Sequence, residues 1–126
     1  MAFYGRKDMA KDDYFVIAAK ILTYLYSCMK KGVIPDREII SADELGINEA
    51  YWLRVMANLS DSGYISGITY AKHVGFPTGL RIDPEEFMIT VAGIEYLHEN
   101  GAMRKALQAI SKYSGIAAGI VQFLGL

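Results

Sequence analysis

The chain has 126 residues, of which 52% are hydrophobic and 21% charged, so it can form one domain with its own core. This composition excludes an intrinsically disordered chain, and no run of about 18 apolar residues could form a membrane-spanning helix. Thirteen Lys and Arg against fourteen Asp and Glu give a net charge of -1. Since neutralising phosphates supplies most non-specific affinity for nucleic acid, DNA binding would depend on local basic patches. A lone cysteine, Cys28, and a start without an apolar signal sequence predict a cytoplasmic protein.

The first predicted helix begins at Asp12 or Asp13, whose carboxylates can cap it, and ends at Gly32. Apolar residues recur along it at steps of three and four, in two neighbouring rows, and only a narrow stripe is polar. A helix this apolar is either central to a core or covered by a partner chain. The first row is Phe15, Ala18, Leu22, Leu25 and Met29, the second is Tyr14, Ile17, Ile21 and Tyr24, and the polar stripe is Lys20, Thr23, Ser27 and Lys30 or Lys31.

Two further helices follow in quick succession. Ser41 and Glu44 form a capping box that starts a very short helix ending at Gly46. Asn48 caps the next helix, predicted over residues 48–62 and ending at Gly63, with four apolar residues on its inward face: Trp52, Val55, Met56 and Leu59. A short helix, a tight turn with glycine and a longer helix are the outline of a helix-turn-helix.

After this helix the residue pattern changes from helical to extended. Residues 64–70 are rich in β-branched and aromatic side chains, residues 75–79 have turn chemistry, and residues 80–82 and 87–89 are candidate return strands. A helix-turn-helix followed by a β-hairpin is a winged helix. The sequence therefore predicts an α+β winged helix-turn-helix, with a three-helix core, a β-hairpin wing over residues 71–82 and extra N- and C-terminal helices.

After the wing, Thr90 is expected to cap a short helix that stops near Asn100, and a last helix is expected to begin at Ala102 or Met103. Residues 113–126 form an almost purely apolar tail, predicted to be helical. No linker interrupts the chain. We therefore expect a single domain over residues 1–126, with residues 1–11 as a flexible start.

Several stretches resemble the YjcQ-like proteins, which are small winged-helix proteins of bacterial and prophage genomes. The second half of that family's helix-turn-helix is similar to residues 46–49, 63–65, Trp52 and Leu59 of this chain. Residues 89–100 resemble its T-x-x-G-x-x-Y-L-x-E-N stretch, through Thr90, Gly93, Tyr96, Leu97, Glu99 and Asn100, and a similar helix start follows at Met103, Arg104, Lys105 and Ala106. The resemblance covers about residues 12–112. It implies a fold like that of DNA-binding regulators.

The sequence gives little support for a catalytic role. Cys28 lies among apolar neighbours, His73 and His98 have no metal-ligand spacing, and no glycine-rich phosphate loop occurs. The carboxylates at Asp83, Glu85 and Glu86 surround Pro84 and are expected in a solvated surface turn. We therefore expect a protein that is not an enzyme, with no cofactor, no metal and no evident small-molecule ligand.

The helix over residues 48–62 carries the best DNA-contact candidates. Tyr51, Arg54 and Asn58 share the face opposite Trp52, and Arg and Asn can read guanine and adenine by paired hydrogen bonds. The alternative is a merely solvated face, since Glu49 and Asp61 on the same helix would repel phosphates.

The wing offers the second set of contact candidates. Lys72, His73 and Arg81 flank its tip and are placed to touch phosphate or the minor groove. Phe76 at the tip either tucks back onto the sheet or contacts a ligand, DNA or protein partner. Arg104, Lys105 and Lys112 add a basic stripe on the last helix, which can equally be its solvated side.

The apolar tail suggests an interface. Gly115 and Gly119 would let another helix approach closely, and the tail would otherwise expose a contiguous apolar patch. We favour a homodimer contact, and the alternative is that the tail folds back on the first helix. The dimer-interface candidates are Ile116, Ile120, Phe123 and Leu124.

The sequence is thus interpreted as a DNA-binding, regulator-like protein of phage or prophage type, with double-stranded DNA and a second copy of itself as partners. The alternative is a protein-protein interaction module on a winged-helix frame that does not bind DNA. The near-neutral charge favours that alternative.

Overall fold

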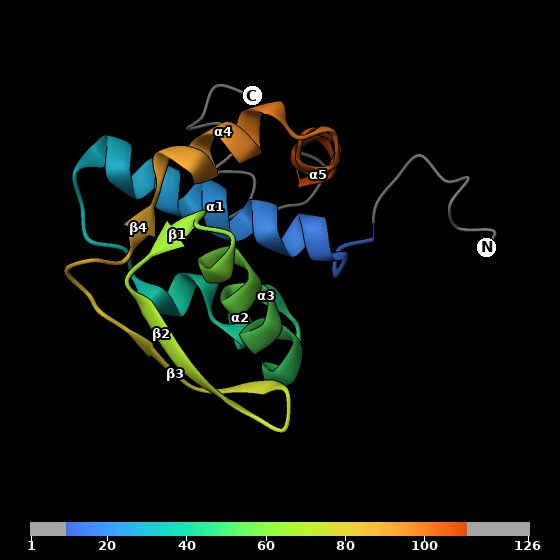
Figure 1. Ribbon diagram of the computed structural model, residues 1–126. Coiled ribbons are helices and arrows are strands. Elements are labelled where there is room, and N and C mark those ends of the chain that lie inside the picture. The colour runs from blue at the N-terminus through green and yellow to red at the C-terminus, as the bar shows by residue number, and fades with distance from the viewer. Residues whose placement is uncertain (1–9, 111–126) are drawn as a thin grey trace.

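A computed structural model describes residues 10–110 of the chain. Within this range the fold is α+β: helices surround two small antiparallel sheets of two strands each, an arrangement compatible with a winged helix (Figure 1). The helical elements are α1 (Tyr14–Lys31), the 3-10 helix η2 (Arg37–Ile40), α2 (Ala42–Leu45), α3 (Glu49–Asp61), α4 (Val91–Glu99) and α5 (Gly101–Ile110). The strands are β1 (Ile65–Ser66), β2 (Ile68–His73), β3 (Phe76–Ile82) and β4 (Met88–Ile89).

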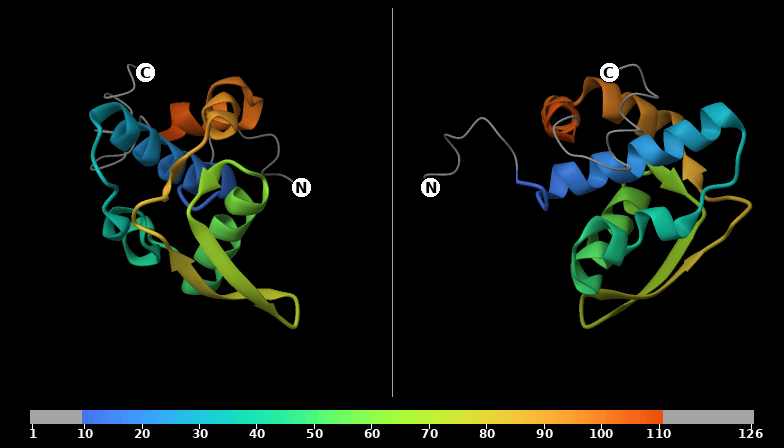
Figure 2. Two further views of the ribbon diagram at one scale, coloured as in Figure 1. Left: turned by 60° about the vertical axis from the view of Figure 1, so that its left-hand side comes forward. Right: turned by 180° about the vertical axis from the view of Figure 1, so that it is seen from behind.

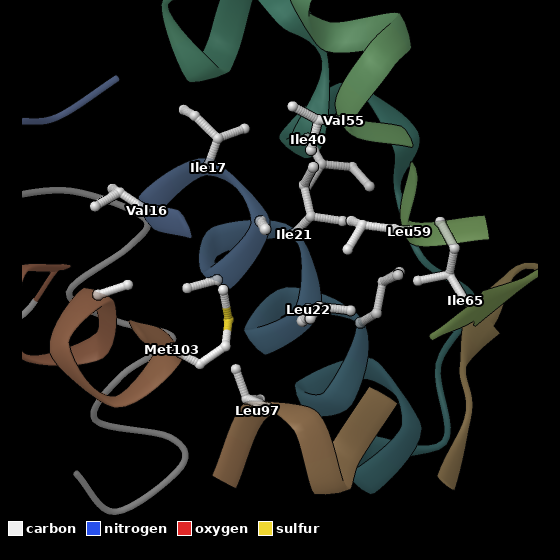
Figure 3. Close-up of a cluster of buried hydrophobic side chains, with 14 of the residues drawn as sticks. Val16, Ile17, Ile21, Leu22, Ile40, Val55, Leu59, Ile65, Leu97 and Met103 are labelled. Carbon is white, nitrogen blue, oxygen red and sulfur yellow. The ribbon is translucent and has the colours of Figure 1, made fainter. Parts of the chain in front are cut away.

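Helix α1 is the centre of the core, as its two apolar rows predict. It begins at the Asp13 cap and ends at Gly32, which has the left-handed conformation expected of a helix stop. It packs against α3, α4, α5 and β4. Figure 3 shows buried side chains of these neighbours converging on Ile17, Ile21 and Leu22.

Two residues of the polar stripe of α1, Thr23 and Ser27, are buried. The Thr23 hydroxyl donates a 3.1 Å hydrogen bond to the carbonyl oxygen of Lys20, one turn earlier. A hydroxyl satisfied by its own helix can be buried at low cost. The central helix is therefore covered around even more of its circumference than its sequence pattern indicates.

Helices α2 and α3 start and stop where the sequence predicts. The Ser41 hydroxyl accepts from the amide of Glu44, Gly46 is left-handed, and the Asn48 side chain accepts from the amide of Tyr51. The inward face of α3 is correct for Val55, Met56 and Leu59, which are buried. Trp52 differs, because it is only half-buried. Its indole N–H donates a 2.7 Å hydrogen bond to the carbonyl of Ile40, so the ring's polar edge ties α3 to η2.

The extended segment predicted over residues 64–70 is divided between two strands, β1 and β2. Gly67 divides it, so that β1 pairs with β4 and β2 pairs with β3. Gly67 has a φ of +81°, and a Cβ there would lie 2.5 Å from the backbone of Glu86 and Phe87. Only glycine allows this close approach, which sends the chain from one small sheet into the other.

The β2–β3 hairpin turns earlier than the sequence indicates. Its loop is Val74 and Gly75, both with positive φ, whereas residues 76–79, predicted as a turn, belong to β3. His73 therefore faces Phe76, and Lys72 faces Pro77, across the two strands. The register slips between the pairs Thr69–Arg81 and Ala71–Thr78, a β-bulge next to Tyr70.

Helices α4 and α5 complete the fold above α1 (Figure 1). Thr90 caps α4 by accepting from the amide of Gly93, and a Cβ on Gly93 would overlap the carbonyl oxygen of Tyr64. Helix α5 begins at Gly101, one or two residues before its predicted start, because Asn100 accepts from the amides of residues 102 and 103. The dimer candidates Ile116, Ile120, Phe123 and Leu124, together with Lys112 and the predicted flexible start up to residue 9, lie outside the described residues.

Candidate nucleic-acid interface

The β2–β3 hairpin lies along α3 and is attached to it at two places (Figure 2). Near the end of α3, the Tyr70 hydroxyl donates to the carboxylate of Asp61 at 2.6 and 2.7 Å. Near the middle of α3, the guanidinium carbon of Arg54 lies 4.5 Å from the centre of the Phe76 ring. Such a distance is that of a cation–π contact. Helix and hairpin therefore form one continuous surface.

Arg54 keeps its hydrogen-bonding capacity in this arrangement. Its side chain is exposed, and its guanidinium lies over the face of the Phe76 ring. A cation–π contact uses the charge of the guanidinium and leaves its N–H groups available to an acceptor. Phe76 thus holds an arginine with unused donors at the edge where α3 meets the hairpin.

Two of the predicted wing contacts lie beside Phe76. Lys72 and His73 are exposed at the end of β2, and His73 is the direct cross-strand partner of Phe76. We call Arg54, Lys72, His73 and Phe76 the tip cluster. Arg54 on the helix and His73 on the opposite strand both adjoin Phe76. Lys72 pairs with Pro77, so the alternation of side chains along β2 places it on the other face of the hairpin end. Arg81 is exposed too, but it pairs with Thr69 at the other end of the hairpin, away from this cluster.

Tyr51 and Asn58 make contacts within the protein instead. The Tyr51 hydroxyl donates a 2.7 Å hydrogen bond to the carbonyl of Asp12, and the Asn58 side chain hydrogen-bonds the hydroxyl of Tyr14. Burial, followed by the charges of Asp13 and Asp12, raises the pKa of Tyr51. Burial also raises the pKa of Tyr14, and the hydrogen bond from Asn58 offsets part of that rise. These two positions therefore fasten α3 to the start of α1, and Arg54 alone of the three faces the hairpin.

The acidic groups of this surface are partly engaged. Because the Asp61 carboxylate accepts its proton in a hydrogen bond, the pKa of Tyr70 is raised. Glu49 is exposed in the first turn of α3, where its charge suits the helix dipole. Asp83 caps a turn by accepting from the amide of Glu85 at 3.0 Å, as expected of a surface turn.

Two residues of types that can serve in catalysis or metal binding, Cys28 and His98, lie in helices. Cys28 is buried in α1, and the ring of His98 lies edge-on to Tyr26 with Nδ1 2.9 Å from the carbonyl of Ile94. No group of three His, Cys, Asp or Glu side chains able to hold a metal ion occurs between residues 10 and 110. The same stretch contains no helix of the length and apolarity needed to cross a membrane.

The sequence alone did not indicate the contact between Arg54 and Phe76. Phe76 is predicted near the tip, but its partner depends on how far the hairpin folds onto α3. The contact of Tyr51 with Asp12 likewise joins a side chain to a backbone carbonyl 39 residues away, and a carbonyl carries no sequence signature.

The described residues thus define an α+β domain. In it a short helix is followed by a longer helix, and a β-hairpin lies along the longer one. The YjcQ protein family matches residues 19–113, and the chain belongs to this family. The match confirms the resemblance seen in residues 46–65 and 89–106. Neither the curated proteins nor the solved structures contain a significant match to the chain.

Proposed function

We propose that this chain is a winged-helix protein of phage or prophage type that binds double-stranded DNA, as a regulator does, and catalyses no reaction. The observation that carries the proposal is the contact of Arg54 with Phe76, which joins α3 to the hairpin and gathers the tip cluster. A winged helix presents these same two elements, helix and wing, to a duplex.

The tip cluster suits the DNA backbone better than a base edge. Arg54 lies against the hairpin, so its free N–H groups are placed to grip a phosphate by two parallel hydrogen bonds. Lys72 adds a second exposed cation at the end of β2. This replaces the base reading expected of Arg54 from helical spacing alone, since Tyr51 and Asn58 are held by α1.

Binding through so few cations should be weak and moderately salt-dependent. Each phosphate contact contributes about 0.9 to the slope of log affinity against log salt, so Arg54 and Lys72 together give a slope of about -1.8. The chain's net charge of -1 supplies no general attraction to add to this. Because the whole chain adds no general attraction, the salt dependence of DNA binding should report on the tip cluster itself.

The test is a fluorescence-anisotropy titration of a labelled duplex with the full chain at two salt concentrations. Arg54→Ala and Lys72→Ala should each weaken binding to all duplexes and lower the slope by about 0.9. Arg104→Ala is the matched control, because Arg104 is an exposed arginine on α5, outside the tip cluster. Equal losses for Arg54→Ala and Arg104→Ala would contradict the proposal.

A protein-protein interaction module is the second candidate, and the contacts of Tyr51 and Asn58 favour it. Two of the three expected reading positions of α3 make hydrogen bonds within the chain, at its surface, and so have fewer groups left for bases. If the folded full chain binds no duplex at low salt, this second candidate replaces the first.

A further inference from the structure

The turn of the β2–β3 hairpin exposes apolar side chains at its extreme end. Val74 is 83% exposed and Phe76 is 54% exposed. They are two positions apart, at the loop and at the first residue of β3. Ile68, Leu80 and Ile82 of the same hairpin pack against the core, whereas the apex is exposed. Apolar side chains exposed together at one place can mark an interaction site.

Val74 is also an unfavourable residue for this turn. Its φ is +52°, and among residues 10–110 it is the only residue other than glycine with a positive φ. A two-residue hairpin loop with both φ values positive favours Asn followed by Gly, and a β-branched side chain resists this conformation. Gly75 fits the second loop position, with a φ of +83°. Val74 therefore stands where turn geometry prefers Asn.

The surroundings of this apex are cationic. Lys72 and His73 precede Val74 directly, and the Arg54 guanidinium covers one side of the Phe76 ring. A hydrophobic apex between cations matches the minor groove of DNA, where apolar side chains press between base steps while basic groups hold the flanking phosphates.

We propose that Val74 and Phe76 enter the minor groove of bound DNA and wedge open a base step, while Arg54 and Lys72 grip the phosphates on either side. This inference rests on the proposed DNA-binding function and specifies its mode. Wedging costs least at flexible pyrimidine–purine steps such as TA, so the preferred duplexes should contain them. Sequence preference would then come from the deformability of the DNA, with no base edge read directly.

The experiment uses a duplex of about 20–30 base pairs with a central TA step and a fluorophore at each end, because bending brings the ends together. The full chain should raise energy transfer between the ends, as a bend of about 20–90° would. Phe76→Ala should abolish the change in transfer and lower affinity about tenfold, which corresponds to about 1.4 kcal/mol. Phe76→Leu keeps an apolar wedge and should retain much of the bend.

The Val74→Asn variant tests the wedge without destabilising the fold. It creates the favoured Asn-Gly loop, so the melting temperature should rise by about 4 °C. Its affinity for the TA duplex should nevertheless fall severalfold, because the apolar apex is gone. Val33→Asn is the matched control: Val33 is a 52% exposed valine in the loop after α1, and its replacement should leave DNA binding unchanged.

The outcomes distinguish this inference from the function on which it rests. Salt-dependent duplex binding that needs Arg54 and Phe76 but shows no bend, with unchanged affinity in Val74→Asn, would overturn the wedge and leave the proposed DNA binding intact. Absence of any duplex binding by the folded chain would overturn both. Binding to vesicles of anionic lipid that depends on Val74 and Phe76, with no bending of DNA, would overturn the wedge in favour of a membrane surface.

Discussion

Helix α1 and the β2–β3 hairpin differ in how far their side chains are buried. Ile17, Ile21 and Leu22 of α1 are fully buried and packed by elements from the whole fold, whereas the hairpin is mostly exposed. The hairpin meets α3 through a surface hydrogen bond from Tyr70 and a cation–π contact with Arg54, and its partly buried apolar residues pack against the edge of the core. Stability is thus concentrated in one region and exposed chemistry in the other, and the two can be altered separately.

The largest effect should come from α1. Leu22→Ala removes a fully buried side chain of α1, the helix against which α3, α4 and α5 pack, and it should cost about 3–5 kcal/mol of unfolding free energy. Urea denaturation measures it. Met29→Ala is the control, because Met29 is a 43% exposed apolar residue of the same helix and should cost far less. Similar losses in the two variants would break the distinction between core and surface.

The contrast between these regions also explains what the sequence could predict. The limits of α1, α2 and α3 follow from local chemistry, since Asp13, Ser41 and Asn48 cap amides within three residues and glycines end the first two helices. The core face follows from helical spacing, because burial repeats with the period of the helix. Both signals lie within a few residues of the feature they predict.

Features that depend on distant partners were not predictable. Gly67 divides the extended segment because the backbone at Glu86 and Phe87 approaches it, which only the closed fold establishes. Thr23 belongs to the polar stripe of α1, and the sequence does not reveal that it is buried with its hydroxyl satisfied by the helix itself. Tyr51 and Asn58 were correctly separated from the buried face of α3, yet the start of α1 lies within their reach.

A smaller effect should come from Trp52, which stands between the two regions. Trp52→Phe keeps most of the packing but removes the indole N–H, leaving the Ile40 carbonyl without this donor. The expected loss of unfolding free energy is about 1–3 kcal/mol. Thermal or urea unfolding measures it, and a variant as stable as the parent would show that the 2.7 Å hydrogen bond does not anchor α3 to η2.

The hairpin should respond locally. Tyr70→Phe removes the hydrogen bond to Asp61 at an exposed position, so global stability should change little. Amides of β2 and β3 should exchange with solvent severalfold faster, while those of α1 keep their protection. Thr69→Ala, at an exposed neighbouring position, is the control. Faster exchange throughout α1 would mean that hairpin and core open together.

The smallest effect should be a pH dependence at Tyr24. Burial raises its pKa to about 12, and its hydroxyl accepts a 2.7 Å hydrogen bond from the amide of Asp36. Because the folded chain favours the neutral hydroxyl more than the unfolded chain does, its contribution to stability is complete below pH 10 and is lost as the pH rises towards 12. The stability difference between the parent and Tyr24→Phe should shrink over that interval. A difference that stays constant would contradict the assignment.

The most direct test of the central claim is to locate the DNA contact by nuclear magnetic resonance. An isotope-labelled full chain is titrated with a duplex that contains a central TA step, and backbone amide shifts are followed residue by residue. We predict that the shifts concentrate at Arg54 and at residues 72–76, with the amides around Arg104 unchanged. Shifts that avoid the tip cluster, or a folded chain whose spectrum does not respond to the duplex at low salt, would contradict the account.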